Sequence, residues 1–247
     1  AIRRYGRKAF LVWYCILALG SFFVLNWIYQ TIRKPGELLS PISSSFAKSP
    51  QATWQSYAPL FEKYSTAIVS AELLAALAQV EANGNPVALT HWRWKWSWYP
   101  WEIYRPASTA IGMFQLTDGT FAEARKYCIR DHQVLTEGFW YDPDSCWLNR
   151  FYSRNIPSHA VEMTAAYLHI NVVAILGSRL RKATADQKER LAAVIHLCGV
   201  KHAQSFAKRG FRMTETERCG THSVQTYISQ VNAMKDRFHR LRQSGVS

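Results

Sequence analysis

Glu81 is the acidic residue in this sequence with the clearest potential for chemistry, and it lies in the segment SAELLAALAQVEANGNP. Leu74 and Leu77 precede it at helical spacing, so we expect its carboxyl on the buried side of a helix. Gly84 and Asn85 are stop signals that place Glu81 in the last turn. Burial and the negative end of the helix dipole both favour the neutral acid, which can protonate a glycosidic oxygen. The alternative is a solvated glutamate or one paired with a lysine.

A second motif, STAIGMFQLTDGTF, covers residues 108–121 and has the form S-x-A-x-G-x-x-Q. Gly112 lets the backbone pass close to a neighbouring helix or to a sugar ring. Gln115 offers both a donor and an acceptor, so beside a protonated carboxyl it can hold that group and bind an acetamido group. The alternative is a plain turn before a helix capped by Thr117 or Asp118.

Together the two segments resemble the soluble lytic transglycosylase family, over residues from about 65 to about 199. The resemblance implies a mainly helical, lysozyme-like domain that cuts the MurNAc-GlcNAc bond of peptidoglycan and leaves a 1,6-anhydro end. It implies that Glu81 acts first as acid and then as base. It also implies substrate contacts for Ser108 and Gln115, with Met113 lining the loop.

The sequence departs from the family pattern in two places. Ala82 stands where family members usually have a serine directly after the glutamate. The segment VIHLCG places His196 where a tyrosine normally lies near the catalytic glutamate, so His196 either takes over that hydrogen bond or is a core histidine. The segment NIPSHAVEMTAAYL resembles another family helix, and within it Glu162 is a candidate residue for the cleft.

A mechanism with one carboxyl is chemically sufficient if the substrate's own C6 hydroxyl attacks, because tethering replaces a second catalytic group. Asp118 and Glu102 are the candidates for a second carboxylate, and with one of them hydrolysis becomes the better account. A third reading is a non-catalytic peptidoglycan-binding scaffold, which the departures at Ala82 and His196 suggest.

The segment HWRWKWSWYPW alternates strictly between aromatic and polar residues, which predicts a short hairpin or extended arm. Trp94 and Trp96 would share one face, where flat rings can pack on sugar rings, and Arg93 and Lys95 the other. The alternative is that these rings bury one face of the hairpin on the core.

The elements that must position these residues follow an apolar N-terminal segment. No charged residue occurs from Ala9 to Ile32, and about 21 apolar residues can cross ~30 Å of hydrocarbon. Basic residues precede the segment, so we expect a cytoplasmic N-terminus at 1–8, a bacterial inner-membrane anchor at 9–30 and a periplasmic remainder. A cleaved signal peptide is the alternative. A Pro- and Ser-rich tether at 31–53 and a catalytic domain at 54–247 complete the organisation.

Periodicity predicts a mainly helical domain with strand character confined to the tryptophan segment. The expected helices run from Tyr57 to Asn83, Asp118 to Cys128, Ser158 to Leu176, Ala185 to Cys198, His202 to Lys208 and Ser223 to Arg242.

Five cysteines and a net charge of +13 restrict the cofactors and partners. We favour disulfides Cys128 to Cys146 and Cys198 to Cys219 from closeness in the chain, although three connectivities are open. No C-x-x-C pair or His/Cys cluster has the spacing of a zinc site, and we expect no cofactor. Positive charge suits anionic wall polymers and lipid headgroups, and no nucleic-acid module is recognisable. The expected partners are glycan strands, the inner membrane and proteins of an envelope-spanning assembly.

Overall fold

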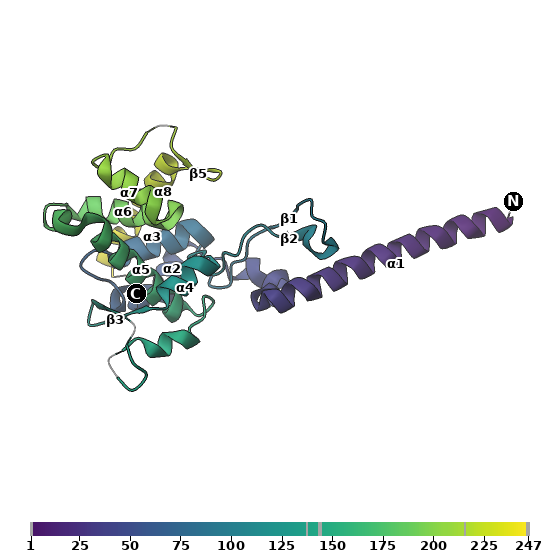
Figure 1. The fold of residues 1–247 in the computed structure, drawn as a ribbon, viewed down its shortest axis with the longest axis horizontal. Helices are drawn as coiled ribbons and strands as arrows, with labels where there is room; N and C mark the ends of the chain where they lie inside the picture. The colour runs from purple at the N-terminus through teal and green to yellow at the C-terminus, as the bar shows by residue number, and fades with distance from the viewer. Residues whose placement is uncertain (1, 137, 143–144, 215, 246–247) are drawn as a thin grey trace.

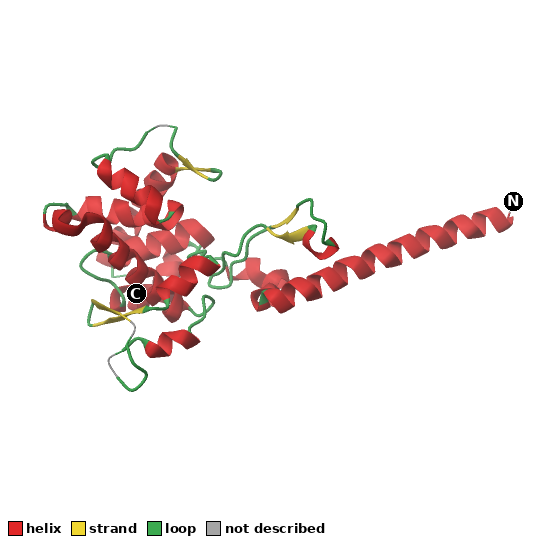
Figure 2. Cartoon of the chain, in the orientation of Figure 1, coloured by secondary structure: helices red, strands yellow, loops and turns green. Residues whose placement is uncertain are grey.

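A computed structural model describes the chain except for residues 1, 137, 143–144, 215 and 246–247 (Figure 1). The described part holds eight α-helices and three two-stranded antiparallel sheets, so the expected mainly helical class is confirmed (Figure 2). The α-helices are α1 (Ile2–Arg33), α2 (Pro50–Lys63), α3 (Ala71–Ala82), α4 (Asp118–Ala124), α5 (Pro157–Leu176), α6 (Ala185–Cys198), α7 (Val200–Lys208) and α8 (Val224–Gln243). The strands are β1 (Trp92–Trp94), β2 (Tyr104–Pro106), β3 (Tyr127–Arg130), β4 (Gln133–Thr136), β5 (Arg218–Cys219) and β6 (His222–Ser223). Four 3-10 helices are η1 (Pro35–Phe46), η2 (Pro100–Glu102), η3 (Trp147–Phe151) and η4 (Gly177–Arg181).

The central element of the globular part is α3. Its residues from Ala71 to Gln79 are all buried, because α2 and α8 pack against it and α5 adds a further contact. Ser70 caps its N-terminus by accepting a hydrogen bond from the backbone N–H of Leu73. Asn83 ends it in the left-handed conformation at φ 51°. The helix is therefore buried on every side, and only its last turn reaches the surface.

The predicted helix boundaries hold for α5 to α8 within two residues. The long helix expected from Tyr57 to Asn83 is wrong, since the chain breaks between α2 and α3. At the break, the Thr66 hydroxyl accepts hydrogen bonds from the backbone N–H groups of Ile68 and Val69, which stabilise the turn in place of helix. The expectation that only the tryptophan segment has strand character is also wrong. The chain forms the hairpin β3–β4 where the α4 helix was expected to continue to Cys128.

Two disulfides cross-link the domain, and both are those favoured from the sequence. Cys128 bonds to Cys146, which fastens β3 to the segment before η3. Cys198 bonds to Cys219, which fastens the end of α6 to β5. Cys15 in α1 is a free, exposed thiol.

Helix α1 extends away from the globular part (Figure 1). Its residues from Arg7 to Arg33 have the length and apolar composition of a membrane span or of a signal sequence. Helix α5 passes the same test, but it is more than half buried in the domain, as a core helix is. Within residues 31–53, where we expect a Pro- and Ser-rich tether, Pro35–Phe46 form the 3-10 helix η1. The Ser43 hydroxyl donates to the backbone carbonyl of Val87, and the Ser43 carbonyl accepts from Nδ2 of Asn85.

Candidate active site

Glu81 lies where α3 emerges from the core, and its side chain is 19% exposed. An open groove of about 480 Å³ begins at this point. Its floor is formed by the end of α3, and Gln115 from the second motif lines it together with Thr90 and His91. The two motifs identified in the sequence therefore both line one groove, the first through Glu81 and the second through Gln115.

Tyr227 is the closest partner of the Glu81 carboxyl. Its hydroxyl donates a hydrogen bond to Oε1 of Glu81 at 2.5 Å, across 146 residues of sequence. Nε2 of His196 lies 3.5 Å from the same oxygen. Both contacts converge on Oε1. No hydrogen bond to Oε2 is found among the described residues, so this oxygen is available to a ligand in the groove.

Burial sets the protonation state of both partners. The desolvated site raises the pKa of Tyr227 well above its usual value, and the nearby Glu81 carboxylate raises it further. Tyr227 is therefore a fixed hydrogen-bond donor. Desolvation lowers the pKa of His196, although the charge of Glu81 and a backbone hydrogen bond with Phe114 act in the opposite direction. His196 is consequently neutral near pH 7 and contributes orientation rather than charge.

Gln115 is held by its own loop. Its Nε2 donates to the backbone carbonyls of Gly112 at 2.9 Å and Ala88 at 3.3 Å. Its backbone has φ 46°, a left-handed conformation that few residues with side chains adopt. The loop thus fixes the amide at the groove rather than leaving it to rotate.

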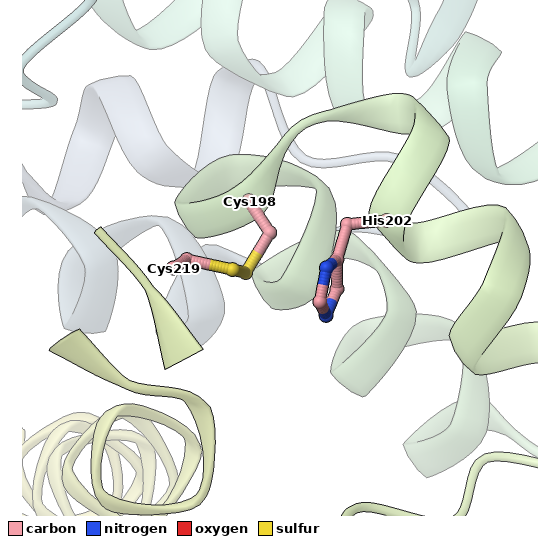
Figure 3. Close-up of side chains that lie close together, drawn as sticks. All are labelled: Cys198, His202 and Cys219. Atoms are coloured by element: carbon pink, nitrogen blue, oxygen red, sulfur yellow. A yellow bond between two sulfur atoms is a disulfide. The ribbon is translucent and has the colours of Figure 1, made fainter. Parts of the chain in front are cut away.

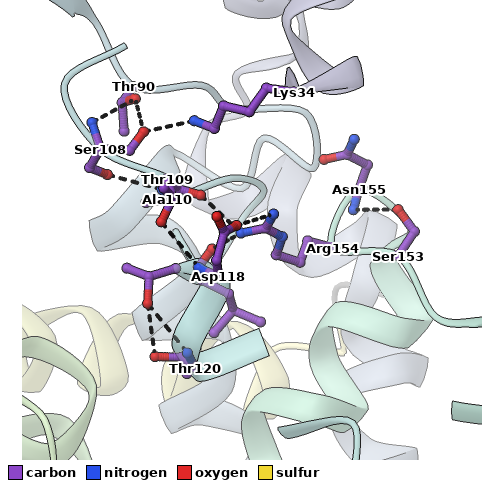
Figure 4. A network of polar contacts seen from close by, with 12 residues as sticks. Lys34, Thr90, Ser108, Thr109, Ala110, Asp118, Thr120, Ser153, Arg154 and Asn155 are labelled. Carbon is purple, nitrogen blue, oxygen red and sulfur yellow. Dashed lines mark hydrogen bonds and ion pairs between the residues drawn. The ribbon is translucent and has the colours of Figure 1, made fainter. Parts of the chain in front are cut away.

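Arg154 bonds to several points of the loop that carries Gln115 (Figure 4). Its guanidinium donates to the backbone carbonyls of Thr109 and Leu116 and forms an ion pair of 2.8 Å with Asp118. At Gly112, with φ +82°, an added Cβ would lie 2.3 Å from the backbone oxygen of Arg154. Glycine is required here because the loop backbone lies directly against the Arg154 backbone.

Ser108 does not line the Glu81 groove. It is exposed at the start of the loop, where its backbone carbonyl accepts hydrogen bonds from Thr90 and Lys34 (Figure 4). Its hydroxyl accepts from the backbone N–H of Ala110. Ser108 and Asp118 line a neighbouring hollow beside the end of α1. The role of Ser108 in this conformation is to shape the loop.

Met113 and Glu162 lie away from the groove. Met113 is fully buried in the core, because the loop turns its side chain inward next to Phe114. Glu162 on α5 is 4% exposed and accepts hydrogen bonds from Tyr152 and from the backbone N–H of Ile129. It lines a separate hollow beside β3. Its contacts fasten α5 to β3, and the expectation that it faces the cleft does not agree with this placement.

The tryptophan segment forms the expected hairpin, with β1 paired to β2. Only its first residue, Trp92, reaches the groove. Trp94 and Trp96 lie farther along the hairpin and are 63% and 83% exposed, so their rings neither line the groove nor pack on the core.

The two candidate second carboxylates are both engaged elsewhere. Asp118 pairs with Arg154 behind the loop, and Glu102 pairs with Arg33 and Arg105 on the hairpin. Among the described residues that line the groove, Glu81 is the only carboxylate.

One group of potential metal ligands occurs in the described chain, formed by His202 with Cys198 and Cys219 (Figure 3). The two sulfur atoms are bonded to each other, which removes both thiolates. His202 instead contacts Glu217, which also pairs with Arg209. This group is therefore a structural cross-link between α6, α7 and the segment that follows.

Sequence reasoning missed Tyr227, which bonds to Glu81, and the η1 residues Ser43 and Ser44, which line the groove. Tyr227 is the one polar-tipped residue on the apolar face of α8 that Ile228 and Val231 also form. That pattern predicts a buried tyrosine that needs a hydrogen-bond partner, but it does not predict that the partner is Glu81. Comparison with protein-family models and with curated protein sequences gives no match, so the assignment of this groove rests on its residues and their geometry.

Proposed function

We propose that this protein is a peptidoglycan lytic transglycosylase that cleaves the MurNAc-GlcNAc bond with Glu81 as its single acid and base. The observation that carries the proposal is the Glu81 carboxyl, which lies in an open groove with Gln115 and receives a hydrogen bond from the buried Tyr227. A lone carboxyl is sufficient for an intramolecular reaction, because the attacking hydroxyl is already part of the substrate.

In this mechanism Glu81 protonates the glycosidic oxygen, and the bond from that oxygen to the anomeric carbon breaks. The resulting carboxylate then takes the proton from the C6 hydroxyl of MurNAc. At the same time the C6 oxygen bonds to the anomeric carbon, which closes the 1,6-anhydro ring. The Tyr227 hydroxyl supports the carboxylate between these two steps, since a hydrogen bond to an ionised group is stronger than one to a neutral group. Gln115 offers its amide oxygen to the substrate, as its Nε2 is bonded to the loop backbone.

In the family pattern a serine follows the catalytic glutamate, and this chain has Ala82 there. Two other groups contact the Glu81 carboxyl in its place. Tyr227 and His196 both face Oε1 of Glu81 from α8 and α6. Both residues lie on helices distant in sequence from Glu81. The buried apolar residues of α3 already hold that helix in place, so these two contacts favour a functional role for the carboxyl over a structural one.

Helix α1 would anchor the enzyme in the bacterial inner membrane through residues 9–30, with the groove in the periplasm. Its apolar composition from Arg7 to Arg33 supports this. An anchored enzyme cuts only near its membrane. Local cutting suits wall remodelling around an envelope-spanning assembly, whose proteins are the candidate partners.

The test is digestion of purified sacculi by the full chain, followed by mass spectrometry of the released muropeptides. We expect 1,6-anhydro ends from the wild type and a release of these ends at least about 100-fold slower from Glu81→Gln. Glu102→Gln is the matched control, since that carboxylate lies on the hairpin outside the groove, and it should retain full activity. Reducing ends in place of anhydro ends would establish a hydrolase. Equal digestion by Glu81→Gln and wild type would exclude catalysis by Glu81.

A further inference from the structure

The hairpin of residues 92–106, called here the tryptophan arm, exposes an unusual set of aromatic side chains. Trp94, Trp96, Trp98 and Tyr99 are 63%, 83%, 90% and 72% exposed. Burying aromatic rings of this size is strongly favourable, and these rings remain in contact with water. Several of them close together in the chain indicate a surface that binds a membrane or another molecule.

The arm lies side by side with the C-terminal half of α1 (Figure 1). Trp101 stacks on Phe22 with ring centroids 6.0 Å apart, and Trp94 meets Phe23 edge-on at 6.1 Å. At the end nearer the domain, Arg33 pairs with Glu102 at 3.1 Å. The arm therefore follows the apolar helix toward its centre instead of folding over the groove.

Polar contacts fix this arrangement. Asn26 and Gln30 are the amides of an otherwise apolar stretch, and they are 0% and 5% exposed. Asn26 donates to the backbone carbonyl of Tyr104 at 2.6 Å, and Gln30 donates to that of Trp101 at 2.7 Å. Side-chain amides on a helix in lipid need such partners, because water is absent there. The arm supplies acceptors for Nδ2 of Asn26 and Nε2 of Gln30, whereas Oδ1 of Asn26 has no hydrogen-bond partner among the described residues.

The depth of these contacts follows from helix geometry. The uncharged run from Ala9 to Ile32 would extend about 36 Å at about 1.5 Å per residue, slightly more than the ~30 Å of a hydrocarbon layer. The arm contacts α1 from Phe22 to Arg33, so its inner contacts begin about ten residues, or roughly 15 Å, before the apolar run ends. The contacts at Gln30 and Arg33 would then lie at the level of the lipid headgroups and upper acyl chains, where tryptophan and tyrosine are enriched, and the contact at Phe22 would lie deeper among the acyl chains.

We propose that the tryptophan arm is a second membrane contact, which inserts its exposed aromatic side chains into the bilayer interface beside the C-terminal end of α1. The proposal rests on α1 as a membrane span, which is part of the proposed function. Arg93 and Lys95 are exposed between the tryptophans and suit anionic headgroups. Because Trp92 at the base of the arm also lines the Glu81 groove, the inserted arm holds the groove at a fixed, short height above the membrane.

The experiment uses the full chain in phosphatidylethanolamine–phosphatidylglycerol vesicles, labelled with a thiol-reactive environment-sensitive dye without reductant, so that both disulfides stay closed. Cys15 is the free thiol and reports on α1 in the wild type. The arm is read with Cys15→Ser/Trp98→Cys. The matched control is Cys15→Ser/Trp140→Cys, since Trp140 is also exposed, at 73%, but packs with Tyr141 in a loop of the globular part.

We expect a blue-shifted emission at position 98 that lipids with a nitroxide near the headgroup quench, no such change at position 140, and quenching at Cys15 by nitroxides deep in the acyl chains. Quenching at Cys15 with an aqueous signal at 98 would overturn the inference and leave the anchor intact. An aqueous signal at both would overturn the anchor and the inference together, whereas digestion of sacculi tests the catalytic proposal separately. If the emission of the label at position 98 is unchanged by vesicles but shifts on addition of soluble glycan strands, the arm binds the substrate and not the membrane.

Discussion

The hydroxyl of Tyr227 and the carboxyl of Glu81 are 2.5 Å apart although 146 residues separate them in the chain. This contact joins α8 to the partly exposed last turn of α3, beside the groove that Glu81 lines. A buried tyrosine that must remain protonated gives the carboxyl a permanent donor, which a side chain on the groove surface could not do because water would compete with it.

Replacing Tyr227 with Phe should lower the rate of sacculus digestion by about 10- to 100-fold, the equivalent of about 1.5–3 kcal/mol for a hydrogen bond to a charged group. The ring stays in place, so packing is preserved. Tyr152→Phe is the matched control, since that partly buried tyrosine also donates to a glutamate, Glu162, at 2.8 Å but away from the groove. The control should lose stability and retain its turnover per folded molecule. Equal losses of turnover in both variants would argue against a specific role of Tyr227.

The stability of the domain should fall as the pH is lowered from about 7 to about 5, because the pKa of His196 is lowered in the folded state below an unfolded value of about 6.5. The unfolded chain then binds more protons than the folded chain, so the contribution is present above that unfolded pKa and is lost as the pH falls toward the folded pKa. His159 and His169 have pKa values lowered by burial and act in the same direction. Thermal unfolding of wild type and His196→Gln across this range measures the effect. The variant should show a shallower dependence on pH, and an unchanged slope would remove His196 as a cause.

Gly112→Ala should destabilise the loop and reduce activity. The new Cβ would meet the Arg154 backbone oxygen at 2.3 Å in a left-handed backbone conformation, and we expect a loss of about 1–3 kcal/mol. Gly119→Ala is the control, since nothing lies within 4 Å of its added Cβ and it is inside α4, where alanine is the better helix former by about 0.5–1 kcal/mol. The free energies of unfolding of the two variants in urea should therefore change in opposite directions, and only Gly112→Ala should lose sacculus digestion. A Gly112→Ala chain as stable and active as wild type would contradict the close approach of loop and Arg154.

Opening the disulfide between Cys198 and Cys219 should lower the free energy of unfolding by about 3 kcal/mol, as the chain-entropy argument gives for a loop of this length. Cys198→Ala/Cys219→Ala, compared with wild type by thermal unfolding under non-reducing conditions, checks this. His196 is two residues before Cys198 on α6, so the variant should also lose activity at temperatures below its unfolding. Stability equal to that of wild type would show that the bridge is not needed to hold α6 against β5.

The sequence alone determined the features that depend on local pattern. Periodicity and caps located α5 to α8, the run of apolar residues located α1, and closeness in the chain favoured the two disulfides that form. The end of α3 and the presence of Glu81 in its last turn also followed from Gly84 and its neighbours. These features are decided by backbone preferences and hydrophobic spacing over a few turns, which a single sequence carries.

Only the tertiary structure decided which distant residues meet. Tyr227 reaches Glu81 because α8 packs on α3, and no spacing in the chain encodes that contact. Met113 turns into the core, and Glu162 faces β3, because buried groups satisfy the packing and hydrogen bonds available around them. The tryptophan arm lies on α1 and not over the groove, since Asn26 and Gln30 find their acceptors in its backbone. These placements depend on packing and hydrogen bonding between elements that are far apart in the chain, and local sequence patterns do not contain that information.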